Sequence, residues 1–152
     1  MKQKSTLELQ NFMPYRLSVL TNRISTLIST AYSESFGIRI PEWRTIAVLG
    51  DTSRLTNSQI AERTAMDKVT VSRAVRDLVQ KRLVARRTSR KDRRVVYLNL
   101  TREGKSVYLQ IVPMALRYEA QILGILEENE REYLDHLLTK LQLGVDELSA
   151  GP

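Results

Sequence analysis

The chain has 152 residues, 42% hydrophobic and 27% charged, a composition typical of one folded domain rather than of a disordered segment. It contains no cysteine, which excludes disulfides and thiolate chemistry, and one histidine, His136, which argues against a histidine metal site or a catalytic triad. Lys and Arg outnumber Asp and Glu by 24 to 17, giving a net charge of +7. No apolar run is long enough to span a membrane and no secretory signal is visible, so we expect a cytoplasmic protein.

The positive charge is concentrated in the middle of the chain. Residues 54–105 contain 15 Lys and Arg against 5 Asp and Glu, whereas residues 119–152 contain 2 against 8. Such a basic segment suits a polyanionic partner, either nucleic acid or an anionic membrane surface. A solvated basic face with no partner has the same composition, so composition alone does not distinguish it from a binding surface, and the sequence motifs are needed to do so.

Helical periodicity dominates the first part of the chain. Apolar residues recur at helical spacing from Pro14 to about Glu34, and Gly37 supplies a left-handed stop after this helix. Pro41 then begins a short second helix, which ends near Asp51.

Two short helices joined by a tight turn come next. Thr56 and Gln59 form a capping box that begins the first of them, and Asp67 caps the second, which runs over 68–81. Residues 64–66 form the turn. The second helix has one apolar face and one polar, cationic face.

After these helices the period changes from helix to strand. Segments 84–88 and 95–100 are rich in β-forming residues and are separated by the cationic run 89–94. This pattern predicts a two-stranded hairpin with a cationic tip.

Long helices complete the chain. Thr101 caps a helix over 102–126 that contains Pro113, which should kink it, and a final helix covers 130–148. With the first helix, these carry apolar stripes that a monomer of this size leaves exposed, unless they pack within one chain. Pairing about a two-fold axis covers the stripes and places two copies of the 68–81 helix about 34 Å apart, one turn of DNA.

Two short helices followed by a basic hairpin predict a winged helix-turn-helix, whose second helix enters the major groove of DNA. Small polar residues at the start of the first helix suit a phosphate oxygen, and arginines at the hairpin tip suit a narrow minor groove. The residues expected to contact DNA are Thr56, Asn57, Ser58, Lys68, Val69, Thr70, Ser72, Arg73, Arg76, Arg90, Lys91, Arg93 and Arg94.

The run from Leu55 to Gly104 resembles the MarR (multiple antibiotic resistance regulator) family of bacterial transcription regulators. The matching pieces are Leu55-Thr56, Ile60-Ala61, Val71-Ser72-Arg73, Leu78, Leu83-Val84, Arg86, Asp92-Arg93-Arg94 and Leu100-Thr101-Arg102-Glu103-Gly104. The resemblance implies a mainly α fold with a small β-hairpin wing (α+β). It also implies a winged helix-turn-helix lobe over 36–105 and a helical dimerisation region built from 1–35 and 106–152.

The resemblance also assigns roles within the wing. The minor-groove arginine is Arg93 or Arg94, and Asp92 is a structural acid that pairs with an arginine such as Arg86. The family usually has glycine where this chain has Arg82, and a left-handed backbone there costs a non-glycine residue roughly 1 kcal/mol.

Family members commonly bind phenolic or aromatic carboxylic acids between the dimer helices and the DNA-binding lobe. Here Tyr15, Arg16 and Trp43 are the candidate ligand-binding residues, because an arginine pairs with a carboxylate in bidentate fashion. Alternatively, Arg16 is an ordinary surface or intersubunit residue and Trp43 belongs to the core.

We therefore expect a homodimeric transcription factor that binds duplex DNA at a pseudo-palindromic site, as a repressor that a small aromatic effector releases. No enzymatic activity, metal site or cofactor is expected. Two alternatives remain: a regulator that needs no ligand, and a winged helix that binds RNA or protein.

Overall fold

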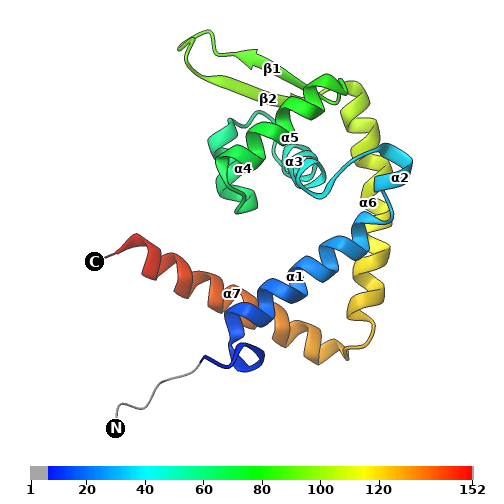
Figure 1. Cartoon of the computed structure of the whole chain (residues 1–152), viewed down its shortest axis with the longest axis vertical. Helices are drawn as coiled ribbons and strands as arrows, with labels where there is room; N and C mark the ends of the chain where they lie inside the picture. The colour runs from blue at the N-terminus through cyan, green and yellow to red at the C-terminus, as the bar shows by residue number, and fades with distance from the viewer. Residues whose placement is uncertain (1–6, 152) are drawn as a thin grey trace. The chain divides into compact units, whose positions relative to one another are not determined.

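The computed structural model describes residues 7–151. The chain divides into two compact units, one ending at Ala115 and the other beginning at Leu116. The elements, in chain order, are η1 (Leu9–Asn11), α1 (Met13–Ser29), α2 (Ser33–Phe36), α3 (Ile40–Asp51), α4 (Asn57–Thr64), α5 (Lys68–Gln80), β1 (Val84–Thr88), β2 (Val96–Leu100), α6 (Arg102–Leu123) and α7 (Glu128–Ala150). This is the mainly helical fold with one antiparallel hairpin that the sequence predicts (Figure 1).

The expected single helix over 14–34 is divided in two. The hydroxyl of Ser29 donates to the carbonyl of Thr26, and that of Thr30 to the carbonyl of Leu27. These side-chain bonds compete with the helical ladder, and α1 ends there. The prediction about Gly37 is correct, because this residue ends α2 with a φ of 60°.

The two short helices begin as predicted. Thr56 Oγ1 accepts the backbone N–H of Gln59, and Gln59 Oε1 accepts that of Thr56, which forms the capping box of α4. Asp67 Oδ1 accepts the N–H of Thr70 at 2.8 Å and caps α5. The turn between the two helices places Ala65 at a φ of 52°.

The C-terminal end of α5 forms a Schellman motif around Arg82. Arg82 has a φ of 60°, its N–H donates to the carbonyl of Val79, and the N–H of Leu83 donates to the carbonyl of Leu78. The backbone is therefore left-handed at a position where this chain lacks glycine.

The beginning of α6 is fastened to this corner. Thr101 Oγ1 donates to the carbonyl of Arg82, and the N–H of Thr101 donates to that of Leu83. A Cβ atom on Gly104 would lie only 2.0 Å from the Leu83 carbonyl oxygen, so no larger residue fits here without displacement. α6 then continues through Pro113 and ends at Leu123, before the expected residue 126.

The hydrophobic core of the first unit lies among α3, α4, α5 and the base of the hairpin, elements that Figure 1 draws in cyan to green. Strand β1 pairs with β2 in the register Val84↔Leu100 to Thr88↔Val96, and Leu55 adds an isolated bridge to Leu98. The core holds the helix-turn-helix against the hairpin. Its fully buried members include Ile38, Ile46, Ile60, Val71, Val75, Leu78 and Ile111.

The second unit contains the end of α6 and α7. No residue of α7 is buried, and several of its apolar side chains are exposed: Leu134, Leu137, Leu138, Leu141, Val145 and Leu148. Among the helices within residues 7–151, none has the combination of length and hydrophobicity that a bilayer crossing requires.

Candidate nucleic-acid interface

Helix α5 presents a polar, cationic face to solvent because its apolar positions point into the core. Val71, Ala74, Val75 and Leu78 are buried. The opposite face, together with Arg86 of β1, lines a shallow groove, which we call the recognition groove. Its lining residues are Lys68, Val69, Ser72, Arg73, Arg76 and Arg86.

A second depression adjoins the first at the same arginine. The start of α4 and one face of the hairpin line this inner hollow, whose polar residues are Thr56, Asn57, Ser58, Arg86 and Arg94. Arg86 borders both depressions, so the exposed face of α5, the start of α4 and the inner face of the hairpin form one surface.

The charged side chains that line this surface are all cationic. No acidic side chain lines the recognition groove or the inner hollow. Within residues 7–151, Lys68, Arg73 and Arg86 have no carboxylate partner. Their charges are therefore available to an anion.

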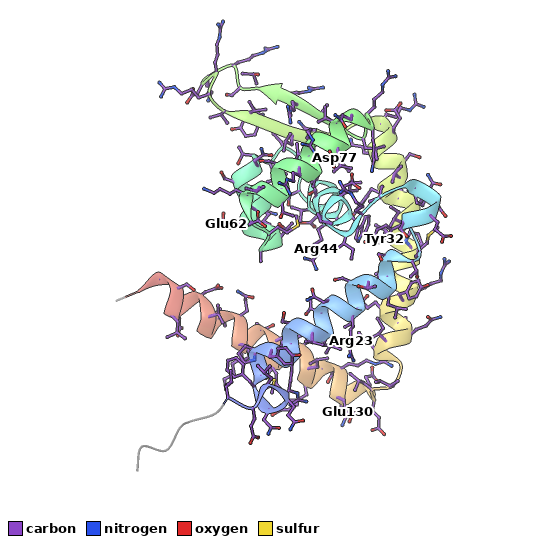
Figure 2. The ribbon with its side chains drawn as sticks, viewed as in Figure 1. Arg23, Tyr32, Arg44, Glu62, Asp77 and Glu130 are labelled. Atoms are coloured by element: carbon purple, nitrogen blue, oxygen red, sulfur yellow. The ribbon has the colours of Figure 1, made fainter. Side chains whose placement is uncertain are left out.

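Side-chain hydrogen bonds shape the hairpin tip. Ser89 Oγ accepts the backbone N–H of Lys91, and Asp92 Oδ1 accepts the backbone N–H of Arg94 at 2.9 Å. Long side chains project from the tip into solvent (Figure 2). The predicted DNA contacts Arg90, Lys91, Arg93 and Arg94 are all exposed here.

The expected pairing of Asp92 with Arg86 is not what the structure shows. The carboxylate of Asp92 bonds to Arg94, whose Nε lies 3.9 Å from Oδ1. Arg86 stands within β1, opposite Leu98, while Asp92 lies in the tip turn and bonds to a neighbour two residues away. Arg86 therefore belongs to the cationic surface rather than to the support of the tip.

Two other predicted contacts have distinct environments. Thr70 Oγ1 donates to Asp67 Oδ2 at 2.5 Å, so its hydroxyl is engaged in the cap of α5. Val69 is 59% exposed, which leaves an apolar side chain on the otherwise polar face.

Asp77, labelled on α5 in Figure 2, positions a predicted DNA contact, a role that the sequence did not reveal. Its Oδ1 accepts Arg76 Nε at 3.0 Å, and its Oδ2 accepts a hydrogen bond from Arg39. The bond from Arg76, with a smaller contribution from Arg39, lowers the pKa of Asp77 below its ordinary value of 3.8. Asp77 therefore stays ionised and restrains the Arg76 guanidinium.

The three ligand candidates are not collected at one site. Tyr15 and Arg16 are exposed in the first turn of α1. The contact between α1 and α3 lies further along, where Arg44 donates to Ser25, about 15 Å away at 1.5 Å per helical residue. Trp43 is half-buried between Tyr32 and Tyr108, at ring-centroid distances of 5.6 and 6.2 Å.

Comparison with known proteins agrees with this geometry. Residues 36–95 match the model of the MarR family. The chain is 32% identical over 108 residues to the transcriptional repressor MdtR of Bacillus subtilis, covering 71% of this chain and 70% of MdtR. These relatives are transcriptional regulators, a class without enzymatic activity.

Solved structures share this fold over most of the chain. A MarR/EmrR family regulator from Acinetobacter sp. ADP1 is 33% identical, with a TM-score of 0.84 over 93% of this chain and 99% of that one. BpsR of Bordetella bronchiseptica, whose DNA binding is regulated by 6-hydroxynicotinic acid, has the same fold at 22% identity, with a TM-score of 0.79 over 91% of this chain and 98% of that one.

Proposed function

Since this chain belongs to the MarR family of DNA-binding transcriptional regulators, we propose that it binds a pseudo-palindromic operator as a homodimer and represses neighbouring genes from the cytoplasm. Helix α5 lies in the major groove, where Arg73 and its neighbours reach base edges. The start of α4 contacts phosphate oxygens, and the tip arginines enter the adjacent minor groove. Bound at a promoter, the dimer excludes RNA polymerase.

The position of Arg86 carries this proposal. Because Arg86 borders both the recognition groove and the inner hollow, the face of α5 and the hairpin address the same duplex from one side. A recognition helix and a wing must do so in order to occupy adjacent grooves.

The homodimer is supported by the exposed apolar residues of the described termini. Helix α1 and the segment before it expose Leu9, Phe12, Leu17 and Leu20, and α7 exposes leucines at helical spacing. Apolar stripes of this kind, one on each of these helices, are rarely left in water. We assign these apolar residues to the two-fold interface. The proposed dimerisation region is 1–35 with 106–152, and the proposed DNA-binding lobe is 36–105. Residues 1–6 lie outside the described range.

A small aromatic acid is proposed as the effector that releases DNA. The support is BpsR, a protein of the same fold whose DNA binding is regulated by 6-hydroxynicotinic acid. Tyr15, Arg16 and Trp43 remain candidate contacts, and because they lie apart within one protomer, each is to be tested separately. To release DNA, such a ligand must bind the DNA-competent and the DNA-incompetent conformation of the dimer with different affinities, typically by 1–3 kcal/mol. Titration with aromatic acids that leaves both Trp43 fluorescence and operator affinity unchanged favours a ligand-independent regulator.

Selection from a random duplex library tests the central claim. We expect the wild-type protein to enrich a palindromic sequence, to bind it as a dimer, and to prefer it to single-stranded RNA of the same sequence. Equal binding to RNA, or no enrichment of duplex DNA, would overturn the assignment.

A further inference from the structure

The hairpin has a second cationic face, whose residues line neither the recognition groove nor the inner hollow. Successive strand residues point to opposite faces, so Arg87, Tyr97 and Asn99 lie on the side away from Arg86. They line an open hollow of about 910 Å³ with Arg54 and Gln59, and it extends to Arg90 and Lys91 at the tip. We call this the outer hollow.

The outer hollow is built to attract an anion. Three arginines and one lysine line it, and no acidic residue does. Within residues 7–151, neither Arg54 nor Arg87 forms an ion pair or a side-chain hydrogen bond. These guanidinium groups therefore keep their donors for an external group.

Arg54 is held in place by an unusual local geometry. Its backbone is left-handed, with a φ of 67°, and its Cζ lies 4.5 Å from the centroid of the Tyr97 ring. A guanidinium that stacks on an aromatic face keeps its in-plane N–H donors free, which suits the bidentate recognition of phosphate. Strained non-glycine residues of this kind cluster at functional sites.

We infer that the outer hollow binds a phosphodiester group of duplex DNA, on the wall of the minor groove opposite the one that the inner hollow faces. The inference rests on the proposed function. A minor groove about 6 Å wide is bounded by two phosphate backbones, so a hairpin within it has one on each side. The inner face of the hairpin, beside α5, contacts the phosphate backbone that separates this minor groove from the major groove holding α5. Arg54 and Arg87, on the outer face, contact the phosphate backbone on the opposite side of the minor groove.

Salt dependence tests this assignment. The probe is the duplex that the wild-type protein selects, and the test variant is Arg54→Gln with Arg87→Gln. We expect the slope of log K against log salt to become shallower by about 0.9 for each phosphate that the variant no longer neutralises, and so by about 1.8 for a dimer in which each protomer releases one phosphate.

Two matched variants separate charge from folding. Arg54→Lys with Arg87→Lys keeps both charges and should retain most of the wild-type slope. Arg102→Gln with Lys105→Gln removes the same charge from exposed residues outside the proposed dimerisation region, which line neither the recognition groove nor either hollow, and should leave the slope unchanged. Circular dichroism and light scattering confirm that each variant is folded and dimeric.

Neutral methylphosphonates then locate the contact. They replace phosphates on the minor-groove backbone that the outer hollow is proposed to contact. They should lower the affinity of the wild-type protein for the duplex, but should not lower the affinity of Arg54→Gln/Arg87→Gln any further. Equal slopes for the test variant and the charge-matched control, or additive losses, overturn the inference while leaving the regulator assignment intact. Failure of the wild-type protein to bind duplex DNA overturns both.

Discussion

Lys81, just after α5, contacts the fully buried carboxylate of Glu42 in α3, with Nζ 2.8 Å from Oε1 and 3.0 Å from Oε2. The same ammonium donates to the carbonyl of Gly37 at 2.6 Å. Glu42 Oε2 also accepts the backbone N–H of Arg39, which caps α3. One buried acid thus joins the beginning of α3 to the residue that follows α5.

Lys81→Met should destabilise the protein by about 2 kcal/mol. Removing one partner of a buried pair typically costs about 3–5 kcal/mol, and we lower this figure because the lysine side chain is 36% exposed and Arg39 remains 3.6 Å away. Urea denaturation measures the effect. Glu42→Gln with Lys81→Met, which keeps the cap acceptor, should recover part of the loss, and additive losses would show that the pair is not coupled.

Arg82→Gly should stabilise the fold. Its left-handed backbone is strained for arginine, and glycine removes a cost of about 1 kcal/mol. Arg82→Ala is the control, because it removes the charge but keeps the strain. We expect the glycine variant to unfold at higher denaturant concentration than the alanine variant, and the reverse order would contradict the Schellman geometry.

Asp67 should make the stability of α5 depend on pH. The hydrogen bond from the Thr70 side chain, and then that from its backbone N–H, lowers the pKa of Asp67 below the ordinary 3.8. Its stabilising effect is therefore present above that value and is lost as the pH falls through the lowered pKa. Asp67→Asn keeps a hydrogen-bond acceptor but does not titrate. The difference in melting temperature between the wild type and Asp67→Asn should therefore become smaller as the pH is lowered from neutral to about pH 2. A constant difference would show that the ionised cap contributes nothing.

Arg73→Ala should relax base preference and weaken operator binding by about 1–3 kcal/mol. The residue is exposed in the recognition groove and has no ion-pair partner within the described chain. Competition with operators mutated at single positions measures the loss. An equal loss for every sequence would identify Arg73 as a phosphate contact instead.

Arg93→Ala and Arg94→Ala, made separately and together, should distinguish the two wing arginines. Arg94 lines the inner hollow and pairs with Asp92, whereas Arg93 lines neither the recognition groove nor either hollow. The variant that loses its preference for A·T-rich flanking sequence identifies the minor-groove residue. If even the double variant keeps the wild-type salt slope, the wing does not contact DNA.

Local signals predicted the helix-turn-helix well. The caps at Thr56 and Asp67 act within three residues, and the change of period after Leu83 marks the hairpin. The break after Ser29 was missed because the apolar stripe continues across it. The assignments of individual DNA contacts remain predictions.

Contacts between distant residues were beyond sequence reasoning. Arg39 meets Asp77 and Glu42 meets Lys81, and no local pattern links residues so far apart in the chain. The stacking of Arg54 on Tyr97 depends on a left-handed backbone at Arg54, and the sequence has no glycine there that would have indicated it. Asp92 was given the wrong partner because the conformation of the tip turn decides which arginine it reaches.

The corner at Arg82, Thr101 and Gly104 has a mechanical consequence. The carbonyls of Arg82 and Leu83, just after α5, accept hydrogen bonds from Thr101, just before α6, and Gly104 allows the two backbones to touch. We therefore expect α5 and the first turns of α6 to move as one body. A tilt of that end of α6 should then tilt the exposed face of α5 with it.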